Sequence, residues 1–290
     1  MVLQLVEVGD SRSLAVETFG DPHGRPVFVL HGTPGSRVGP YPRTSVLYRL
    51  GVHLIAFDRP GYGDSTRLPG RRVASAAADV EAIADALGLD EIAILGRSGG
   101  GPHALACAAL LPDRVSRVAA LVSLAPRTAE GLDWYAGMTP SNVHAYQEAE
   151  RGSPFAASFQ ARSRRIRADP ASVIRGLVPE LPPTDRALVT DSGIRQRLIS
   201  TYRQAFRNSA DGWIDDVLAF LADWGFKVED ITVPTRLWHG ADDQFSPVGH
   251  SRWLADHIPG AELYLEPGAA HFGALQVMAE AMRWAGAATS

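Results

Sequence analysis

The feature that most constrains the fold of this chain is a rhythm in which short apolar runs alternate with longer helical patterns. Each run ends at Gly, Pro or Asp, and its length is that of a strand. Strands that alternate with helices in this way form a mostly parallel sheet covered by helices on both faces. Buried strands are predicted at Val27–Leu30, His53–Phe57, Ile92–Leu95, Val118–Leu124, Thr235–Trp238 and Glu262–Leu265.

Two more runs, Leu3–Val8 and Ser13–Phe19, show rough alternation and are joined by a Gly-Asp-Ser-Arg turn. They predict an antiparallel hairpin at one edge of the sheet. Between the buried runs, Val73–Leu87 and Ala104–Leu111 have helical spacing and stop at Gly88 and Pro112 respectively. The chain is therefore predicted to have an α/β fold with a central sheet of about eight strands.

One long interruption breaks the rhythm between residues 126 and 230. This stretch is helix-like, rich in Arg, and broken at Pro140, Pro154, Pro170 and Pro182-Pro183. We interpret it as a helical lid inserted into a discontinuous core. The predicted domains are a core of residues 1–125 and 231–290 and a lid of residues 126–230.

The bulk composition favours a small molecule as the partner over a nucleic acid or a membrane. With 290 residues and 46% apolar content the chain can bury a large core, and its net charge of -4 indicates no polyanionic partner. Cys107 is the single cysteine, which excludes a disulfide framework or a thiolate metal cluster. The N-terminus lacks the pattern of a signal peptide and no stretch is long enough to span a bilayer, so we expect a cytoplasmic protein. The oligomeric state is left open.

The motif Gly96-Arg97-Ser98-Gly99-Gly100 stands between a predicted strand and a predicted helix. A strand that turns directly into a helix holds the serine in strained backbone geometry, and the flanking glycines avoid collisions across the turn. The helix N-terminus would aim its N–H groups, that of Gly99 included, at developing negative charge. Ser98 is therefore a candidate nucleophile, and the alternative is a glycine-rich turn in which Ser98 caps the helix.

Further motifs make the chain resemble the α/β-hydrolase superfamily, in particular its esterase, haloperoxidase-like and proline-iminopeptidase-like branches. His31-Gly32-Thr33-Pro34 follows a strand, and Asp58-Arg59-Pro60-Gly61-Tyr62-Gly63-Asp64-Ser65 follows the next one. The resemblance implies that the Thr33 N–H is a second oxyanion donor, because Pro34 has no N–H, and that His31 orients this loop. We interpret the Asp58 loop as a structural turn.

The same resemblance supplies the acid and the base in the chain order Ser, acid, His. Gly240-Ala241-Asp242-Asp243-Gln244-Phe245-Ser246-Pro247 is similar to the family's Gly-x-x-Asp-x-x-x-Pro, whose register selects Asp243 over Asp242. Gly268-Ala269-Ala270-His271-Phe272 is similar to its Gly-x-x-His-Phe loop and makes His271 the base. His103 and His239 are expected to be packing residues.

The resemblance implies hydrolysis of an ester-like or amide-like bond through an acyl enzyme on Ser98, without cofactor or metal. An acyltransferase, a lyase, a cofactor-free oxygenase or a ligand receptor on the same scaffold stays open. Haloalkane dehalogenases and epoxide hydrolases are disfavoured, because these relatives carry Asp at the position of Ser98. Trp134, Tyr135, Met138 and Trp213 of the lid are expected to line the substrate pocket, or alternatively to pack lid helices together.

Overall fold

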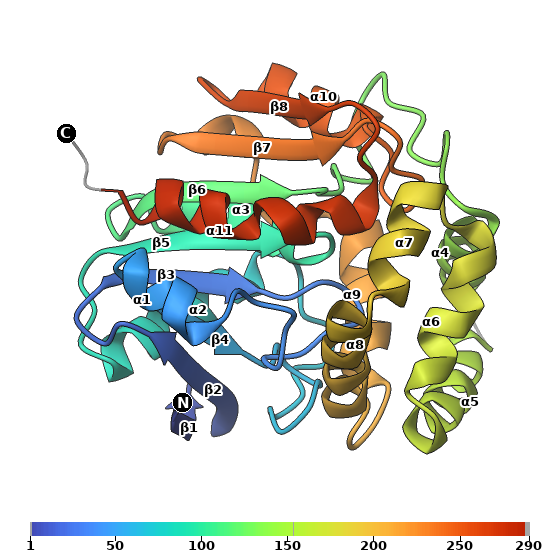
Figure 1. Ribbon diagram of the computed structural model, residues 1–290, viewed down its shortest axis with the longest axis horizontal. Coiled ribbons are helices and arrows are strands. Elements are labelled where there is room, and N and C mark those ends of the chain that lie inside the picture. Colours follow the sequence, from blue (N-terminus) through green and yellow to red (C-terminus); the bar gives the residue numbers. More distant parts are fainter. Residues whose placement is uncertain (1, 153, 288–290) are drawn as a thin grey trace.

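A computed structural model describes residues 2–152 and 154–287 of the chain. These residues form an eight-stranded sheet with helices on both faces (Figure 1). The strand order across the sheet is β1-β2-β4-β3-β5-β6-β7-β8. The strands are β1 (Val2–Val8), β2 (Arg12–Gly20), β3 (Arg25–Leu30), β4 (Val52–Phe57), β5 (Ile92–Arg97), β6 (Val115–Leu121), β7 (Thr235–Gly240) and β8 (Glu262–Glu266).

The sheet is antiparallel at one edge and parallel elsewhere. β1 pairs antiparallel with β2, as the hairpin prediction requires, and β2 pairs antiparallel with β4. The pairs from β4 through β3, β5, β6 and β7 to β8 are all parallel. Because parallel strands end at the same edge of a sheet, the loops after these strands lie together.

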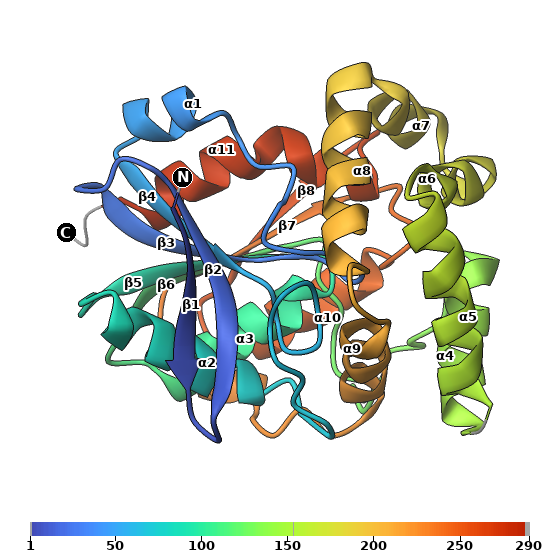
Figure 2. The ribbon, with the colours of Figure 1, turned by 90° about the horizontal axis from the view of Figure 1, so that it is seen from below.

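Helices cover the two faces of the sheet (Figure 2), and alternate residues of a strand belong to clusters with different helices. Phe28 and Leu30 belong to a cluster with α2 and α3, whereas Val27 and Val29 belong to a cluster with α11. Residues buried on both faces explain the unbroken apolar run of β3. The helices of these layers are α1 (Thr44–Arg49), α2 (Ser75–Ala86), α3 (Gly100–Leu110), α10 (Gly249–His257) and α11 (Ala274–Ala285).

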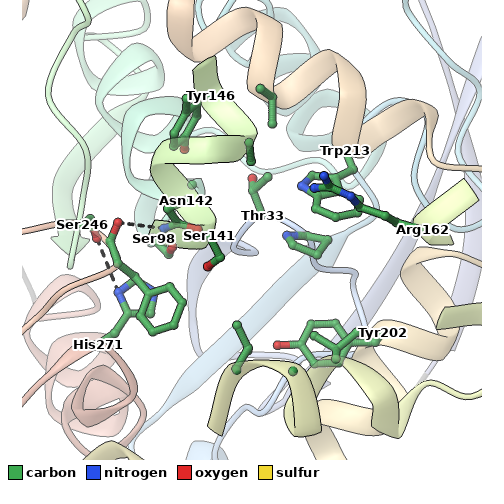
Figure 3. Close-up of a pocket in the computed structure, with 18 of the residues that line it drawn as sticks. Thr33, Ser98, Ser141, Asn142, Tyr146, Arg162, Tyr202, Trp213, Ser246 and His271 are labelled. Atoms are coloured by element: carbon green, nitrogen blue, oxygen red, sulfur yellow. Dashed lines mark hydrogen bonds between the residues drawn. The ribbon is translucent and has the colours of Figure 1, made fainter. Parts of the chain in front are cut away.

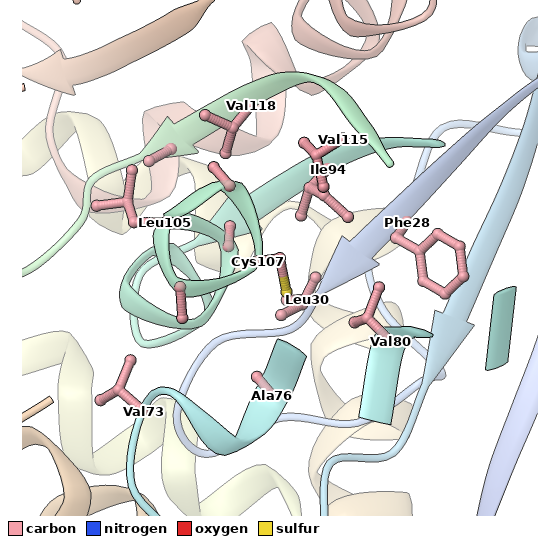
Figure 4. Packing of buried hydrophobic residues seen from close by; sticks show 14 of the residues in the cluster. Phe28, Leu30, Val73, Ala76, Val80, Ile94, Leu105, Cys107, Val115 and Val118 are labelled. Carbon is pink, nitrogen blue, oxygen red and sulfur yellow. The ribbon is translucent and has the colours of Figure 1, made fainter. Parts of the chain in front are cut away.

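Helix α3 is the most completely buried helix next to the sheet. Figure 4 shows its Leu105 and Cys107 side chains among residues of the strands and of α2. Cys107 is fully buried, and burial raises the pKa of its thiol. The thiol therefore serves as a small apolar packing group.

Two predicted strands differ from the structure. The run at Glu262–Leu265 forms β8, but β8 is an edge strand and not a buried one: the side chains of Tyr264 and Leu265 are 47% and 38% exposed. A run of apolar residues can form a buried strand, or an edge strand whose side chains are partly covered by long polar ones. The second case applies to β8, because the Arg236 guanidinium lies 4.8 Å from the centre of the Tyr264 ring. The run at Val118–Leu124 ends as a strand at Leu121, because Val122 has a positive φ of 48°.

Between β6 and β7 the described residues form six α-helices and two short 3-10 turns, and the six helices lie across the edge of the sheet where the parallel strands end (Figures 1 and 2). Pro140 and Pro183 begin two of these helices, and Pro154 and Pro170 directly precede two others. Proline fits there because the first turn of a helix leaves its N–H groups unpaired. The helices, hereafter the inserted helices, are α4 (Pro140–Glu150), α5 (Phe155–Ala168), α6 (Ala171–Leu177), α7 (Pro183–Thr190), α8 (Ser192–Ala205) and α9 (Asp211–Leu221). Within the described ranges, no helix has both the length and the apolar composition to cross a membrane.

His250 of α10 fixes the segment that leads from β6 to the inserted helices. Its Nδ1 accepts a hydrogen bond from the Ala125 N–H at 3.1 Å, and its Nε2 donates to the Trp134 carbonyl at 3.1 Å. Burial, together with the nearby His239, lowers the pKa of His250 to about 4. A neutral imidazole protonated on Nε2 makes both bonds, so protonation of Nδ1 removes one of them.

We therefore expect His250 to make the fold acid-sensitive. The unfolded chain binds the proton near pH 6.5 and the folded chain only near pH 4, so stability present above pH 6.5 is lost as the pH falls. His250→Gln keeps an acceptor and a donor but does not titrate. Between pH 7 and pH 5, its free energy of unfolding should therefore fall by about 2 kcal/mol less than that of the parent. Urea unfolding at both pH values measures this. His144→Gln, at an exposed position of α4, should behave like the parent, and an unchanged pH dependence in His250→Gln contradicts the interpretation.

Candidate active site

The backbone at Ser98 is held in a left-handed conformation, with a φ of 55°, directly between β5 and α3. A Cβ atom on Gly96 would collide with the Gly100 carbonyl oxygen, and a Cβ atom on Gly100 would collide with the Leu30 carbonyl oxygen. These contacts require glycine at both positions. The turn therefore has the tight geometry predicted from the sequence, and it is stabilised by a 2.8 Å hydrogen bond from the Ser98 N–H to the Leu121 carbonyl.

Ser98 and His271 line one cavity of about 540 Å³, enclosed between the loops after the parallel strands and the inserted helices (Figure 3). Most of its wall is apolar, and the polar exceptions include Ser141, Asn142, Arg162 and Arg165. The apolar wall is formed chiefly by Leu124, Tyr146, Ile166, Leu177, Trp213, Val217, Phe220, Phe245 and Phe272. The cavity has the size and character of a small-molecule site.

His271 is bonded to a carboxylate on the side of the ring that carries Nδ1. Its Nδ1 lies 2.8 Å from Asp243 Oδ2, while Asp243 Oδ1 accepts hydrogen bonds from the backbone N–H groups of Phe245 at 2.7 Å and Ser246 at 3.1 Å. Ser246 Oγ lies 3.4 Å from His271 Nδ1 and donates to the Val122 carbonyl at 2.7 Å. With Nδ1 held by Asp243, Nε2 is the ring nitrogen left for a substrate or nucleophile.

Asp243 is buried and ionised. Burial raises the pKa of its carboxyl, but the charge of His271 and the hydrogen bonds from His239 and His271 outweigh burial and hold the pKa well below its ordinary value. His239, expected to be a packing residue, lies with Nε2 3.3 Å from Asp243 Oδ2. The neighbouring Asp242 is exposed. The structure thus brings Asp243, and not Asp242, to His271.

Two backbone N–H groups next to Ser98 have no hydrogen-bond partner in the part of the chain that the structure describes: those of Thr33 and Gly99. The Thr33 side chain packs directly on Gly99, where a Cβ atom would collide with Thr33 Oγ1. Unpartnered N–H groups beside a candidate nucleophile are suited to bind an oxyanion.

His31 lies behind the Thr33 loop and supports it, as the sequence predicts. Its Nδ1 donates to the Gly32 carbonyl at 2.8 Å, and its Nε2 accepts from the Arg59 N–H at 3.2 Å. Burial, reinforced by the Arg59 charge, lowers the pKa of His31 well below its ordinary value. The ring is therefore neutral, as these two bonds require.

The Asp58 turn is a buried structural unit. Asp58 Oδ1 accepts from the Arg37 N–H at 2.7 Å, Oδ2 accepts from the Asp64 N–H at 3.2 Å, and the Arg37 guanidinium pairs with the same carboxylate. Asp58 thus hydrogen-bonds its own loop, as expected, and also fixes Arg37 from the preceding loop.

A family model described as alpha/beta hydrolase fold matches residues 25–276. The chain belongs to the α/β-hydrolase family. It is 30% identical over 264 residues to the pimeloyl-[acyl-carrier protein] methyl ester esterase of Chromobacterium violaceum, with 89% of this chain and 91% of that protein covered. It is also 30% identical to the 2-hydroxymuconate semialdehyde hydrolase of Pseudomonas putida, with 83% and 79% covered. The structure of an esterase from Exiguobacterium antarcticum shares the fold, with a TM-score of 0.72 at 22% identity over 98% of this chain and 97% of that one.

The inserted segment is the part of this chain that the sequence predicts least well. Trp213 lines the cavity as expected, but Trp134, Tyr135 and Met138 do not: they pack with the core cluster instead. Trp134 is held there because its Nε1 donates to the Ala125 carbonyl at 2.8 Å and its ring stacks edge-on against Tyr135, Tyr146 and His250. The predicted role of these three residues as pocket wall is therefore wrong.

Sequence reasoning also missed Asp216 of α9. This fully buried carboxylate accepts hydrogen bonds from core residues, among them the Thr33 hydroxyl at 2.5 Å and the Arg59 guanidinium at 2.6 Å. A signal was present, because Asp215 and Asp216 interrupt an otherwise apolar helical run. Pairing that run with arginines far away in the sequence requires the tertiary structure.

No cluster of three or more His, Cys, Asp or Glu side chains within the described ranges is arranged to hold a metal ion. The polar groups around the cavity are instead those of a hydrogen-bonded site: a hydroxyl, an imidazole with its carboxylate, and backbone N–H groups. These groups can move one proton and bind one developing negative charge.

The geometry of the site predicts opposite outcomes for two adjacent aspartates. Asp243→Asn replaces the acceptor facing His271 Nδ1 with an amide that favours the wrong tautomer, so kcat for a chromogenic ester should fall about 10³–10⁴-fold. Asp242→Asn, at the exposed neighbouring position, should keep kcat within about twofold of the parent. Steady-state kinetics of both purified variants measure this. Equal losses in the two would contradict the assignment of the acid.

Proposed function

We propose that this enzyme is a serine esterase that cleaves a carboxylic ester of a small molecule through an acyl enzyme on Ser98. The supporting observation is that Ser98, the His271–Asp243 pair and two unpartnered N–H groups meet at one largely apolar cavity. Acyl transfer needs a nucleophile, a base held in one tautomer, and donors for the oxyanion, and the three groups correspond to these needs.

In the acylation step, His271 Nε2 takes the proton of Ser98 Oγ as Oγ attacks the ester carbonyl carbon. Asp243 holds the other proton on Nδ1 and stabilises the imidazolium. The carbonyl oxygen becomes an oxyanion that accepts hydrogen bonds from the N–H groups of Thr33 and Gly99. The intermediate then collapses: the C–O bond to the alcohol breaks, and the alcohol leaves with the proton from Nε2.

In the deacylation step, water replaces the alcohol. His271 Nε2 removes a proton from the water as it attacks the acyl carbon, and the same two N–H groups bind the second oxyanion. Breaking the bond to Ser98 Oγ releases the acid, and Nε2 returns the proton to Oγ. The proposed cycle uses residues of this chain and one water molecule.

The cavity favours a substrate with an apolar arm. Its wall is mostly aliphatic and aromatic, and Arg165 adds a positive charge to the lining, whereas the charge of Arg162 is paired with Glu148 at 2.9 Å. The name of the Chromobacterium relative states that it acts on a methyl ester, which supports an ester over an amide. The proline iminopeptidases of Xylella fastidiosa match only 38% of this chain. An ester is therefore the substrate class we propose.

Labelling of Ser98 tests the nucleophile. A fluorophosphonate should modify the parent stoichiometrically and leave the Ser98→Ala variant unmodified, with ester turnover reduced at least about 10⁴-fold in the variant. Peptide mapping distinguishes Ser98 from Ser246, the second serine near His271. A label on Ser246, or undiminished labelling of Ser98→Ala, would overturn the proposal.

The acceptor of the acyl group separates an esterase from an acyltransferase. With an added alcohol or amine at moderate concentration, we expect free acid to remain the main product, because the proposed deacylation uses water. Product analysis by mass spectrometry measures the ratio. A dominant transfer product would replace hydrolysis by acyl transfer while leaving the role of Ser98 intact.

Narrowing the cavity should shorten the preferred ester. Ala145 of α4 lines the cavity, and Ala145→Phe should lower kcat/KM for a p-nitrophenyl octanoate about tenfold relative to the acetate, because the added ring occupies the space of the acyl chain. His144→Phe adds a ring at the adjacent, exposed position and serves as the matched control. If both variants keep the parent's chain-length profile, the acyl chain does not occupy this part of the cavity.

A further inference from the structure

A single carboxylate of the inserted helices, that of Asp216, lies at the centre of a buried polar cluster. Asp216 is fully buried on α9, and each of its oxygens has more than one partner. Oδ2 accepts from Thr33 Oγ1 at 2.5 Å, Arg59 Nη2 at 2.6 Å and the Tyr62 hydroxyl at 2.8 Å. Oδ1 accepts from Arg71 Nη2 at 2.6 Å and lies 3.3 Å from His103 Nε2.

The carboxylate is ionised in this cluster. Burial raises the pKa of Asp216, but the charges of Arg59 and Arg71 and the contact with His103 outweigh burial and hold the pKa well below its ordinary value. A buried carboxylate with two arginines and a short bond from a hydroxyl is a strong and directional acceptor. Groups bonded to it are therefore held in fixed positions.

Two of the five partners of Asp216 belong to the Thr33 loop or bind it. The Thr33 hydroxyl donates to Asp216, which fixes the side chain of the residue that carries one unpartnered N–H group. Arg59 donates to Thr33 Oγ1 at 3.0 Å, to the Gly32 carbonyl at 3.2 Å and to the His31 carbonyl. Arg59 is itself oriented by Asp216. The loop is thus tied to the carboxylate directly and through Arg59.

The Thr33 side chain also connects the two N–H groups. It packs on Gly99, which carries the second one, so closely that a Cβ atom on Gly99 would collide with Thr33 Oγ1. A carboxylate that fixes the rotamer of Thr33 therefore fixes the contact between the two residues that carry the donors. Oxyanion donors act only when they are held at the right distance from the reacting oxygen.

We propose that Asp216 is a positioning residue for ester hydrolysis: from an inserted helix, it holds the Thr33 loop so that the N–H groups of Thr33 and Gly99 converge on the oxyanion. The inference rests on the proposed function, in which these groups bind the oxyanion. The inserted helices consequently do more than cover the substrate, because one of them carries part of the support of the oxyanion hole.

Thr33→Val tests this link without removing the carboxylate. Valine keeps the shape and the backbone N–H of threonine but cannot donate to Asp216, whose other partners remain. We expect kcat to fall about tenfold with KM close to that of the parent, because the loss of activity falls on the transition state, while the lost hydrogen bonds also lower the melting temperature. Thr33→Ser restores a donor and should recover most of the lost kcat, which a loss of packing alone would not do.

Tyr62→Phe is the matched control. It removes a hydrogen bond to the same Asp216 oxygen, of 2.8 Å against 2.5 Å for Thr33, but keeps the Thr33 bond to Asp216 and the aromatic ring that packs against His31. It should lower the melting temperature and leave kcat within about twofold of the parent. A loss of kcat in Tyr62→Phe equal to that in Thr33→Val would mean that the cluster only stabilises the fold, and would overturn the proposal.

The rate of fluorophosphonate labelling separates this proposal from the proposed function. In Thr33→Val, labelling of Ser98 should go to completion but about tenfold more slowly, because the phosphonyl oxygen occupies the oxyanion position. Complete labelling at the parent's rate would overturn the positioning role and leave the esterase proposal standing. In Asp216→Asn, the further replacement Thr33→Val should have less effect on kcat than it has in the parent, and full additivity would contradict the link.

Discussion

The interaction on which the site depends is the pairing of one buried carboxylate, that of Asp216, with Arg59 and Arg71. Removing one partner from a buried ion pair leaves an uncompensated charge and costs about 3–5 kcal/mol. Undocking α9 from the core would break both ion pairs and the Thr33 hydrogen bond together. The carboxylate therefore keeps the inserted helices in register with the loop after β3, and the cavity between them keeps one shape.

The second constraint is the close approach of the loops after β7 and β8. A Cβ atom on Gly240 would collide with the Ala269 carbonyl, and the pairing of the two strands continues beyond their ends as the Asp242 N–H donates to that carbonyl at 3.0 Å. This contact brings Asp243 and His271 from separate strands to 2.8 Å. The Asp242 N–H makes this contact and the residue is exposed to solvent, whereas the next residue, Asp243, is buried. The register of the contact between the two loops thus decides that Asp243, and not Asp242, lies against the His271 imidazole.

Periodicity and turn chemistry predicted the sheet, the edge hairpin and the strand-to-helix turn at Ser98, because each depends on residues close together in the sequence. The strand-to-helix position of its motif placed Ser98, and the resemblance to the α/β-hydrolase family placed Asp243 and His271; in the structure Ser98 and His271 line one cavity and Asp243 is bonded to His271. Sequence reasoning failed where the partner is remote. The Thr33–Asp216 bond joins residues 183 positions apart, and a Trp134 buried in the core has the same local signature as one in a pocket wall. The apolar character of a side chain indicates that it is buried, but not which part of the protein it packs against.

The electrostatic balance behind the Thr33 loop explains how a buried carboxylate can lie so near a site that stabilises negative charge. Arg59 and Arg71 exceed the charge of Asp216 by one, and the adjacent His31 is neutral. Arg97, next to Ser98, has no salt-bridge partner among the described residues, and although burial lowers the pKa of its guanidinium, arginine remains charged in proteins. Of the charged groups in contact with Asp216, the arginines therefore outnumber the carboxylate. In a low-dielectric interior such an excess of positive charge favours an oxyanion over the neutral carbonyl, so Asp216 orients the loop without opposing the charge that develops there.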